Sequence, residues 1–176
     1  MSKASDEVLV EFLQRVEEAS AGSIPQATRE ILLGSSEREA KDELRRLLAT
    51  THSASIRNAA AIALGDLEDP EAIGIVRRLL NESTTVGARG SLLYALRGRD
   101  VVKILPELVS CIMHGAYEER HEAMSLVRSI DAVVDADVIE RSIERVEAAV
   151  DAAQADSDID RLSLLTELLA ALKDAS

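Results

Sequence analysis

The chain has 176 residues, and its 32 acidic and 20 basic side chains give a formal net charge of −12 at pH 7. Hydrophobic residues make up 47% of the sequence but aromatic residues only 2%, so the core must consist of Leu, Ile, Val and Ala. The negative charge argues against sequence-independent binding of nucleic acid, because its summed field repels phosphate, and the single Cys excludes a disulfide framework.

Apolar residues recur every three or four positions along the whole chain, which is typical of amphipathic helices, and no stretch alternates as a strand would. Cap residues divide the helices: Ser36 with Glu39 forms a capping pattern, Asp69 precedes Pro70, and Pro106 suits the first turn of a helix. We therefore predict about ten helices, at residues 5–20, 25–33, 36–50, 53–67, 70–81, 86–97, 101–114, 117–130, 136–153 and 158–173.

Internal repeats decide the predicted fold. The segment Leu44–Leu48 recurs 32 residues later as Val76–Leu80, and Ile56–Leu64 recurs at the same offset as Ala88–Leu96. A helix pair with this period buries its apolar face only against its neighbours, so the repeats must stack. We predict an all-α fold, a right-handed α–α superhelix whose second helices line a concave face.

We expect one repeat domain over residues 1–176. Its N-terminal helices occupy residues 1–50, its best repeats residues 53–114, and its degenerate repeats and acidic cap residues 117–176. In the cap, Asp156-Ser157-Asp158 is expected to form a polar linker and N-cap before the final helix, which closes the stack as a terminal repeat must.

Three arginines, Arg57, Arg89 and Arg120, hold equivalent places in successive repeats. The structural interpretation is that they bridge neighbouring repeats through backbone carbonyls or carboxylates. The alternative is a ladder of cations for an anionic ligand. The near-neutral charge of the centre and the shortage of aromatic side chains disfavour nucleic acid as that ligand.

The run from Ile56 to Ile73 resembles the HEAT-like repeat of the phycobilisome-lyase type, with an arginine, small residues, Ala-Leu-Gly, then Asp-Pro and Ala. The resemblance continues in weaker form at 87–114 and 118–150 and implies a HEAT-like solenoid. Within the run, the alanines let two helices approach closely, Gly65 is expected to let the chain turn, and Asp69 starts the partner helix.

The sequence indicates no catalytic, cofactor-binding or metal-binding residue. The histidines His52, His114 and His121 form no recognisable nucleophilic arrangement, and no glycine-rich loop follows a strand. Cys111 and His114 are three residues apart on one predicted helix, but two ligands make a poor metal site. We expect a buried thiol and an imidazole at the rim.

The last 46 residues are the most acidic part of the chain, with 12 acidic and 4 basic side chains between 131 and 176. Asp137, Glu140, Glu144, Glu147 and Asp151 fall three or four residues apart, which places them on one stripe of a helix. Arg141 and Arg145 offset part of the repulsion among them. The stripe is either a solvated outer face or a docking surface for a basic partner.

The stretches 89–96 and 114–123 resemble small HEAT-type immunity proteins of bacterial toxin systems. Such proteins bind and neutralise a toxin, often a basic enzyme, through acidic or aromatic surfaces. Core packing is the alternative for Tyr94, and stabilisation of a helix N-terminus is the alternative for the acidic residues. The resemblance nominates five contact residues: Tyr94, Tyr117, Glu118, His121 and Glu122.

Taken together, these features predict a non-enzymatic protein-binding module without a cofactor. Its most specific form is an immunity-type protein that neutralises a basic toxin or effector, as a monomer or weak dimer. The alternatives are an adaptor with several partners and a chromophore-handling protein related to phycobilin lyases. No apolar run reaches 18 residues and no secretory leader is evident, so we expect a cytoplasmic protein that binds no membrane.

Overall fold

The computed structural model describes residues 3–18, 32, 34, 36–156 and 158–174. The predicted all-α class is confirmed, because the described residues form helices and turns and no strand. None of the described helices is long and apolar enough to span a bilayer. The helices are α1 (Lys3–Glu18), α3 (Glu37–Thr50), α4 (Ala54–Asp66), α5 (Ala72–Leu80), α6 (Gly90–Tyr94), α7 (Leu105–His114), α8 (Tyr117–Arg128), α9 (Ala136–Asp156) and α10 (Ile159–Asp174), with 3₁₀ turns η1 (Ser83–Thr85) and η2 (Val102–Ile104).

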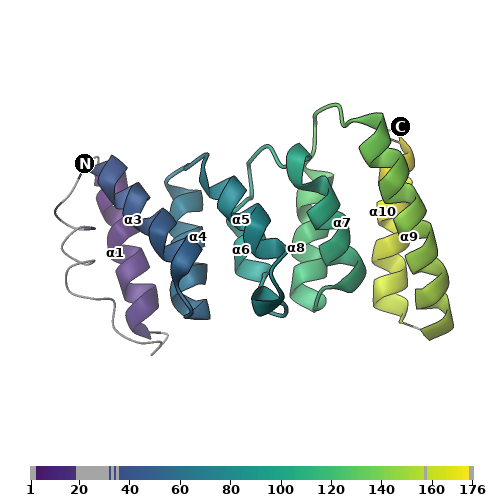
Figure 1. The fold of residues 1–176 in the computed structure, drawn as a ribbon, viewed down its shortest axis with the longest axis horizontal. Coiled ribbons are helices and arrows are strands. Elements are labelled where there is room, and N and C mark those ends of the chain that lie inside the picture. Colours follow the sequence, from purple (N-terminus) through teal and green to yellow (C-terminus); the bar gives the residue numbers. More distant parts are fainter. Residues whose placement is uncertain (1–2, 19–31, 33, 35, 157, 175–176) are drawn as a thin grey trace. The chain divides into compact units, whose positions relative to one another are not determined.

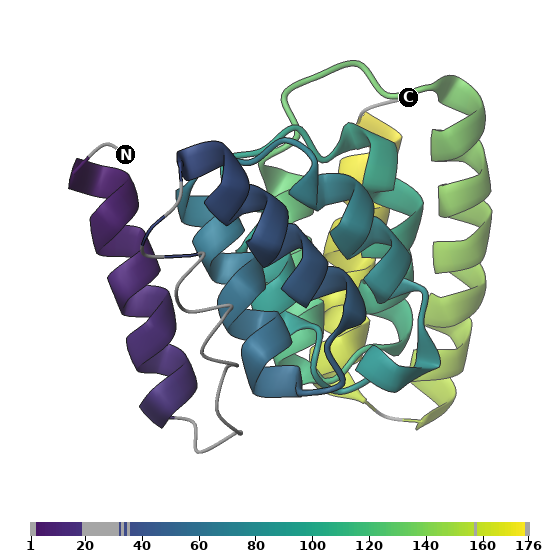
Figure 2. The same ribbon diagram turned by 60° about the vertical axis from the view of Figure 1, so that its left-hand side comes forward.

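The chain divides into two compact units, Met1–Ala95 and Leu96–Ser176. In the first unit, α3 and α4 lie side by side, and α1 and α6 both pack against α4 (Figures 1 and 2). Four alanines of α4 are buried, so neighbouring helices approach its backbone closely, as predicted; they are Ala59, Ala60, Ala61 and Ala63. The predicted helix at 25–33 lies outside the described residues apart from Leu32, which is buried.

The expected role of Gly65 as a turn residue is wrong. Gly65 lies inside α4, and a Cβ atom at this position would come within 2.7 Å of the carbonyl oxygen of Ala95. The residue in the left-handed region at this helix end is Glu68, with φ 55°. Glycine is therefore needed at position 65 for the close approach of two backbones, because any side chain would collide with Ala95.

The start of the partner helix follows the expected chemistry, although α5 begins two residues later than predicted. The buried carboxylate of Asp69 accepts hydrogen bonds from the backbone N–H groups of Glu71 and Ala72, at 2.8 and 3.2 Å. The same side chain pairs with Arg45 of α3 at 3.0 Å. Asp69 thus caps α5 and links it to α3 through an ion pair.

The single helix predicted at 86–97 is also wrong, since α6 covers only Gly90–Tyr94. Two glycines with positive φ, Gly87 at 81° and Gly98 at 73°, bend the backbone on either side of it. The side chain of Arg89 faces back toward η1, where it bonds the carbonyl oxygen of Glu82 at 3.1 Å and the hydroxyl of Thr85 at 3.2 Å. These bonds stabilise a loop where helical periodicity continues in the sequence.

The second unit contains two antiparallel helix pairs, α7 with α8 and α9 with α10. The helix α10 packs against α9, α8 and α7, and α9 also contacts α7 (Figure 1). Pro106 lies in the first turn of α7, as predicted. The carboxylate of Asp158 accepts the backbone N–H of Arg161 at 3.0 Å, which confirms the predicted N-cap of the final helix.

Candidate functional site

The predicted acidic stripe occupies the outward face of α9. Glu140, Glu144, Glu147 and Asp151 are all exposed. On the opposite face of the same helix, small and apolar side chains pack against the rest of the second unit. The buried residues on this face are Ile139, Ser142, Val146, Ala149 and Ala153.

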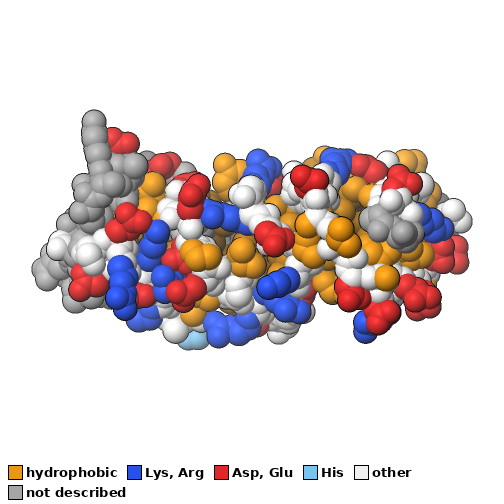
Figure 3. All heavy atoms as spheres, turned by 90° about the horizontal axis from the view of Figure 1, so that it is seen from above, with side chains coloured by type: hydrophobic (Ala, Val, Ile, Leu, Met, Phe, Trp, Pro, Cys, Tyr) orange, Lys and Arg blue, Asp and Glu red, His pale blue; other side chains and the backbone are white. Residues whose placement is uncertain are grey.

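Within the described residues, few cations neutralise this stripe. Glu147 pairs with Lys173 of α10 at 2.8 Å, but both side chains are about half exposed. Arg141, on the same helix, donates to the backbone carbonyl of Asp137 and pairs with no carboxylate among the described residues. Acidic side chains are visible along the part of the surface formed by α9 and α10 (Figure 3). The α9 stripe therefore presents negative charge to solvent.

A second candidate surface lies where α8 and α10 begin. The rings of Tyr117 and His121, one helical turn apart on α8, are 4.3 Å apart between centroids. His121 Nε2 lies 3.4 Å from Oδ1 of Asp160, near the start of α10. Tyr117 is 62% exposed and Ile159 is 81% exposed, so an aromatic ring and an aliphatic side chain face solvent in this part of the second unit. Such exposed apolar groups beside polar ones are common in protein interfaces.

The repeat arginine of α8 holds this surface in place. Arg120 lies 3.3 Å from a carboxylate oxygen of Asp158 and 3.1 Å from one of Asp160. The pKa of Asp158 is lowered chiefly by the backbone N–H of Arg161 and further by the charge of Arg120. These contacts support the structural interpretation of Arg120, whereas the bonds of Arg89 to Glu82 and Thr85 fix the turn that precedes α6. In α4, the side chain of Arg57 is buried, and its Nε atom has no hydrogen-bond partner.

The remaining nominated residues differ in how accessible they are. Glu118 is exposed at the start of α8, whereas Glu122 forms a two-pronged ion pair with Arg97 at 2.6 and 3.1 Å. Tyr94 belongs to the first unit and is 45% exposed, so the core-packing alternative for this residue is wrong. A partner that used Glu122 would have to compete with Arg97, while Glu118 and Tyr94 face solvent.

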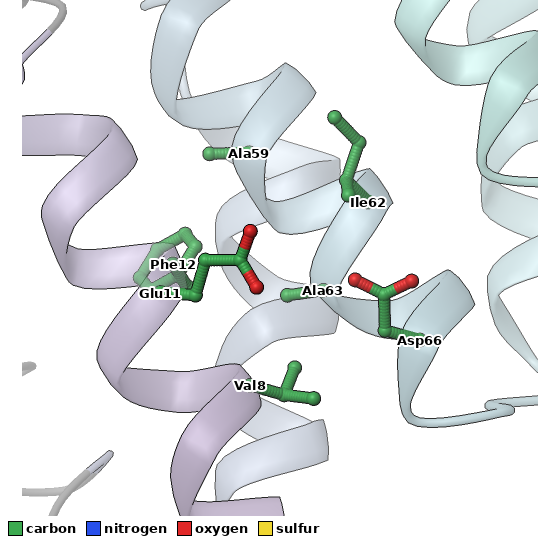
Figure 4. Close-up of a pocket in the computed structure, with 7 residues that line it drawn as sticks. All are labelled: Val8, Glu11, Phe12, Ala59, Ile62, Ala63 and Asp66. Carbon is green, nitrogen blue, oxygen red and sulfur yellow. The ribbon is translucent and has the colours of Figure 1, made fainter.

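A shallow groove lies in the first unit between α1 and α4. Its empty volume is about 150 Å³, and Figure 4 shows the carboxylates of Glu11 and Asp66 facing the same space across an apolar floor. The floor and walls are formed by Val8, Phe12, Ala59, Ile62 and Ala63. This volume includes space that is open to solvent, so the groove is a surface depression and offers no enclosed site for a cofactor.

Within the described residues, no group of three His, Cys, Asp or Glu side chains is arranged to hold a metal ion. Cys111 is buried in α7, and His114 is exposed at the end of that helix, as predicted. Partial desolvation of the imidazole lowers the pKa of His114, and the charges of Arg161 and Arg145 lower it further. The described residues therefore offer exposed charged and apolar side chains to a binding partner.

The comparison with protein families gives one match. The HEAT repeat family matches residues 9–97, slightly more than half of the chain. The chain belongs to this family. HEAT repeats generally mediate protein–protein interactions and are typically non-enzymatic scaffolds. No curated protein and no solved structure matches this HEAT repeat protein.

The family match supports the HEAT-like resemblance of residues 56–73 and distinguishes neither phycobilisome lyases nor immunity proteins. In this HEAT repeat protein, the α9 stripe and the surface around Tyr117 lie outside the matched residues.

The spacing of the sequence predicted the acidic stripe of α9, but it did not indicate Asp160 or Ile159 as part of a candidate surface. The signal that the sequence offered is Ile159 itself, because this aliphatic residue interrupts a run of polar residues in the first turn of the predicted helix.

Proposed function

We propose that this HEAT repeat protein is a non-enzymatic module that docks a basic surface of another protein onto the outward face of α9. The observation that carries the proposal is the stripe of Glu140, Glu144 and Asp151. These three exposed carboxylates have no cationic partner among the described residues, on a helix whose other face is buried. Like charges at this spacing destabilise an isolated helix, so a basic partner would relieve repulsion as it binds.

The exposed end of α8 is a second surface that we propose for contact with the partner. Tyr117 presents a large ring at low entropic cost, which is the usual property of an interface anchor. Its neighbour Glu118 is exposed and adds negative charge. A partner with basic residues around an apolar pocket would match both features.

The test compares two triple variants with the same change in net charge. The first, E140K/E144K/D151K, reverses the stripe. The control, E7K/D131K/D174K, reverses three exposed acidic residues at other sites. After co-purification at low salt identifies a partner, calorimetry measures the Kd of each purified variant. We expect the stripe variant to bind about tenfold or more weakly and the control to change little. An acidic best partner, or equal losses in both variants, would contradict the proposal.

The most specific form of the proposal is an immunity-type protein whose partner is a basic toxin or effector. The resemblance of 89–96 and 114–123 and the acidic surface of α9 support it. In that case, co-expression should suppress the toxicity of the partner, and the stripe variant should lose this protection. One stoichiometric partner would favour this form, whereas several unrelated partners would favour an adaptor.

The chromophore-handling alternative has weaker support. The groove between α1 and α4 is small, and two carboxylates face it, which suits neither the size nor the acidic side chains of an open-chain tetrapyrrole. Incubation of the protein with such a pigment should leave the absorption spectrum of the pigment unchanged.

A further inference from the structure

The surface around Tyr117 holds a histidine between an aromatic ring and a carboxylate. The ring centroids of Tyr117 and His121 are 4.3 Å apart on α8, and His121 Nε2 lies 3.4 Å from Oδ1 of Asp160 on α10. The side chain of His121 is 41% exposed, so it exchanges protons with the solvent. Histidine is the residue whose charge ordinarily changes between about pH 5 and 8, where carboxylates stay ionised. The charge of this surface therefore depends on the protonation of His121.

The carboxylate beside His121 is shared with a permanent cation. The guanidinium of Arg120 lies 3.1 Å from Oδ2 of Asp160 and 3.3 Å from a carboxylate oxygen of Asp158. A guanidinium stays protonated throughout this pH range. Two carboxylates against one guanidinium leave the group negative while His121 is neutral. Protonation of His121 cancels that negative charge and places a cation next to the Tyr117 ring.

Within the described residues, no other charged side chain is hydrogen-bonded or ion-paired to His121. The helix α7 also packs against α8, and its titratable side chains make no such contact with His121; they are Glu107, Cys111 and His114. On α8 itself, Glu118 lies three residues before His121 and is exposed. Glu118 adds negative charge that does not change between about pH 5 and 8.

We propose that protonation of His121 weakens the docking of a basic partner at Tyr117, so that the complex is favoured above about pH 7 and its formation releases a proton. The inference rests on the proposed function, because it concerns a partner with a basic surface. A cation of that partner meets net negative charge beside Tyr117 when His121 is neutral, and it meets an imidazolium when His121 is protonated. By reciprocity, the bound cation makes His121 harder to protonate.

The test uses an oligoarginine peptide as the basic partner, because its side chains keep a constant charge across the pH range. Y94F removes the other tyrosine of a chain that has no tryptophan, so the fluorescence then reports on Tyr117 alone. Titrations at about pH 5.5 and about pH 7.5, at equal low ionic strength, give the Kd of the peptide. We expect binding to be at least about threefold weaker at the lower pH, because one added charge repels the peptide.

Variants in the same Y94F background assign the effect to His121. H121Q is neutral at both pH values and should bind the peptide tightly at both. H121R carries a permanent positive charge and should bind it weakly at both. H114Q is the control and should retain the pH dependence, because partial desolvation and the charges of Arg161 and Arg145 lower the pKa of His114. Circular dichroism checks that each variant keeps its helices.

The outcomes separate this inference from the proposed function. Equal affinities of the Y94F chain at the two pH values, or a pH dependence that persists in H121Q, would overturn the inference alone. Failure of the peptide to bind at about pH 7.5 would contradict the proposed function and the inference with it.

Discussion

Gly65 of α4 and Ala95 at the end of α6 touch backbone to backbone, so that a Cβ atom at position 65 would lie 2.7 Å from the Ala95 carbonyl oxygen. The contact explains why a glycine is used inside a helix, where it costs stability relative to alanine. Because the atom that it meets belongs to backbone, a larger residue would have to displace a whole segment.

The first prediction follows from this contact. Gly65→Ala should lower the free energy of unfolding by about 1–3 kcal/mol, because overpacking forces backbone shifts. Urea denaturation followed by circular dichroism measures the change. The matched control is Gly74→Ala in α5, where no atom lies within 4 Å of the new methyl group and the change should be neutral or slightly stabilising. A stable Gly65→Ala variant would show that α4 and α6 do not pack this closely.

The second prediction concerns Asp69, whose side chain is fully buried and serves both Arg45 and the start of α5. Asp69→Ala should cost about 3–5 kcal/mol, because it removes a helix cap and leaves Arg45 without its buried partner. Asp69→Asn should cost less, since it keeps an acceptor for the backbone. Glu71→Gln, which removes an exposed carboxylate that also pairs with Arg45, should cost below about 1 kcal/mol. Chemical denaturation of the three variants ranks them.

The third prediction is a pH dependence at Glu167. The two-pronged contact with Arg128, at 2.6 Å for both bonds, lowers the pKa of this carboxyl. A lowered folded-state pKa adds stability above the unfolded-state pKa, and this stability is lost as pH falls through the folded-state pKa. Because both side chains are about half exposed, Glu167→Gln should cost only about 0.2–1 kcal/mol at neutral pH. The difference from wild type should vanish in acid, and a constant difference would exclude the ion pair as its cause.

The fourth prediction tests Tyr117 as an interface anchor. Tyr117→Ala should weaken binding of the purified partner about tenfold or more, while thermal unfolding changes little because the ring is 62% exposed. Val133→Ala is the control, since that side chain is 98% exposed and outside the proposed interface. Equal affinities of both variants would remove Tyr117 from the interface.

Local patterns in the sequence were sufficient for the helix ends that are governed by nearby residues. Ser36 and Glu39 form the predicted capping box, and Asp158 caps α10, because both motifs act within one turn of the chain. The prediction of one helix at 86–97 failed because apolar spacing does not reveal the backbone conformation of this segment. Its apolar spacing continues, but the positive φ of Gly87 and Gly98 interrupts the helix.

Helical periodicity was enough to predict the all-α class, the repeat period and the outward position of the α9 stripe, because it places residues on helix faces without knowledge of their neighbours. Which distant residues meet depends on the tertiary structure. His121 and Asp160, 39 residues apart in the sequence, lie 3.4 Å apart. Such contacts depend on how the helices pack against one another, and the apolar periodicity of the sequence does not determine that packing.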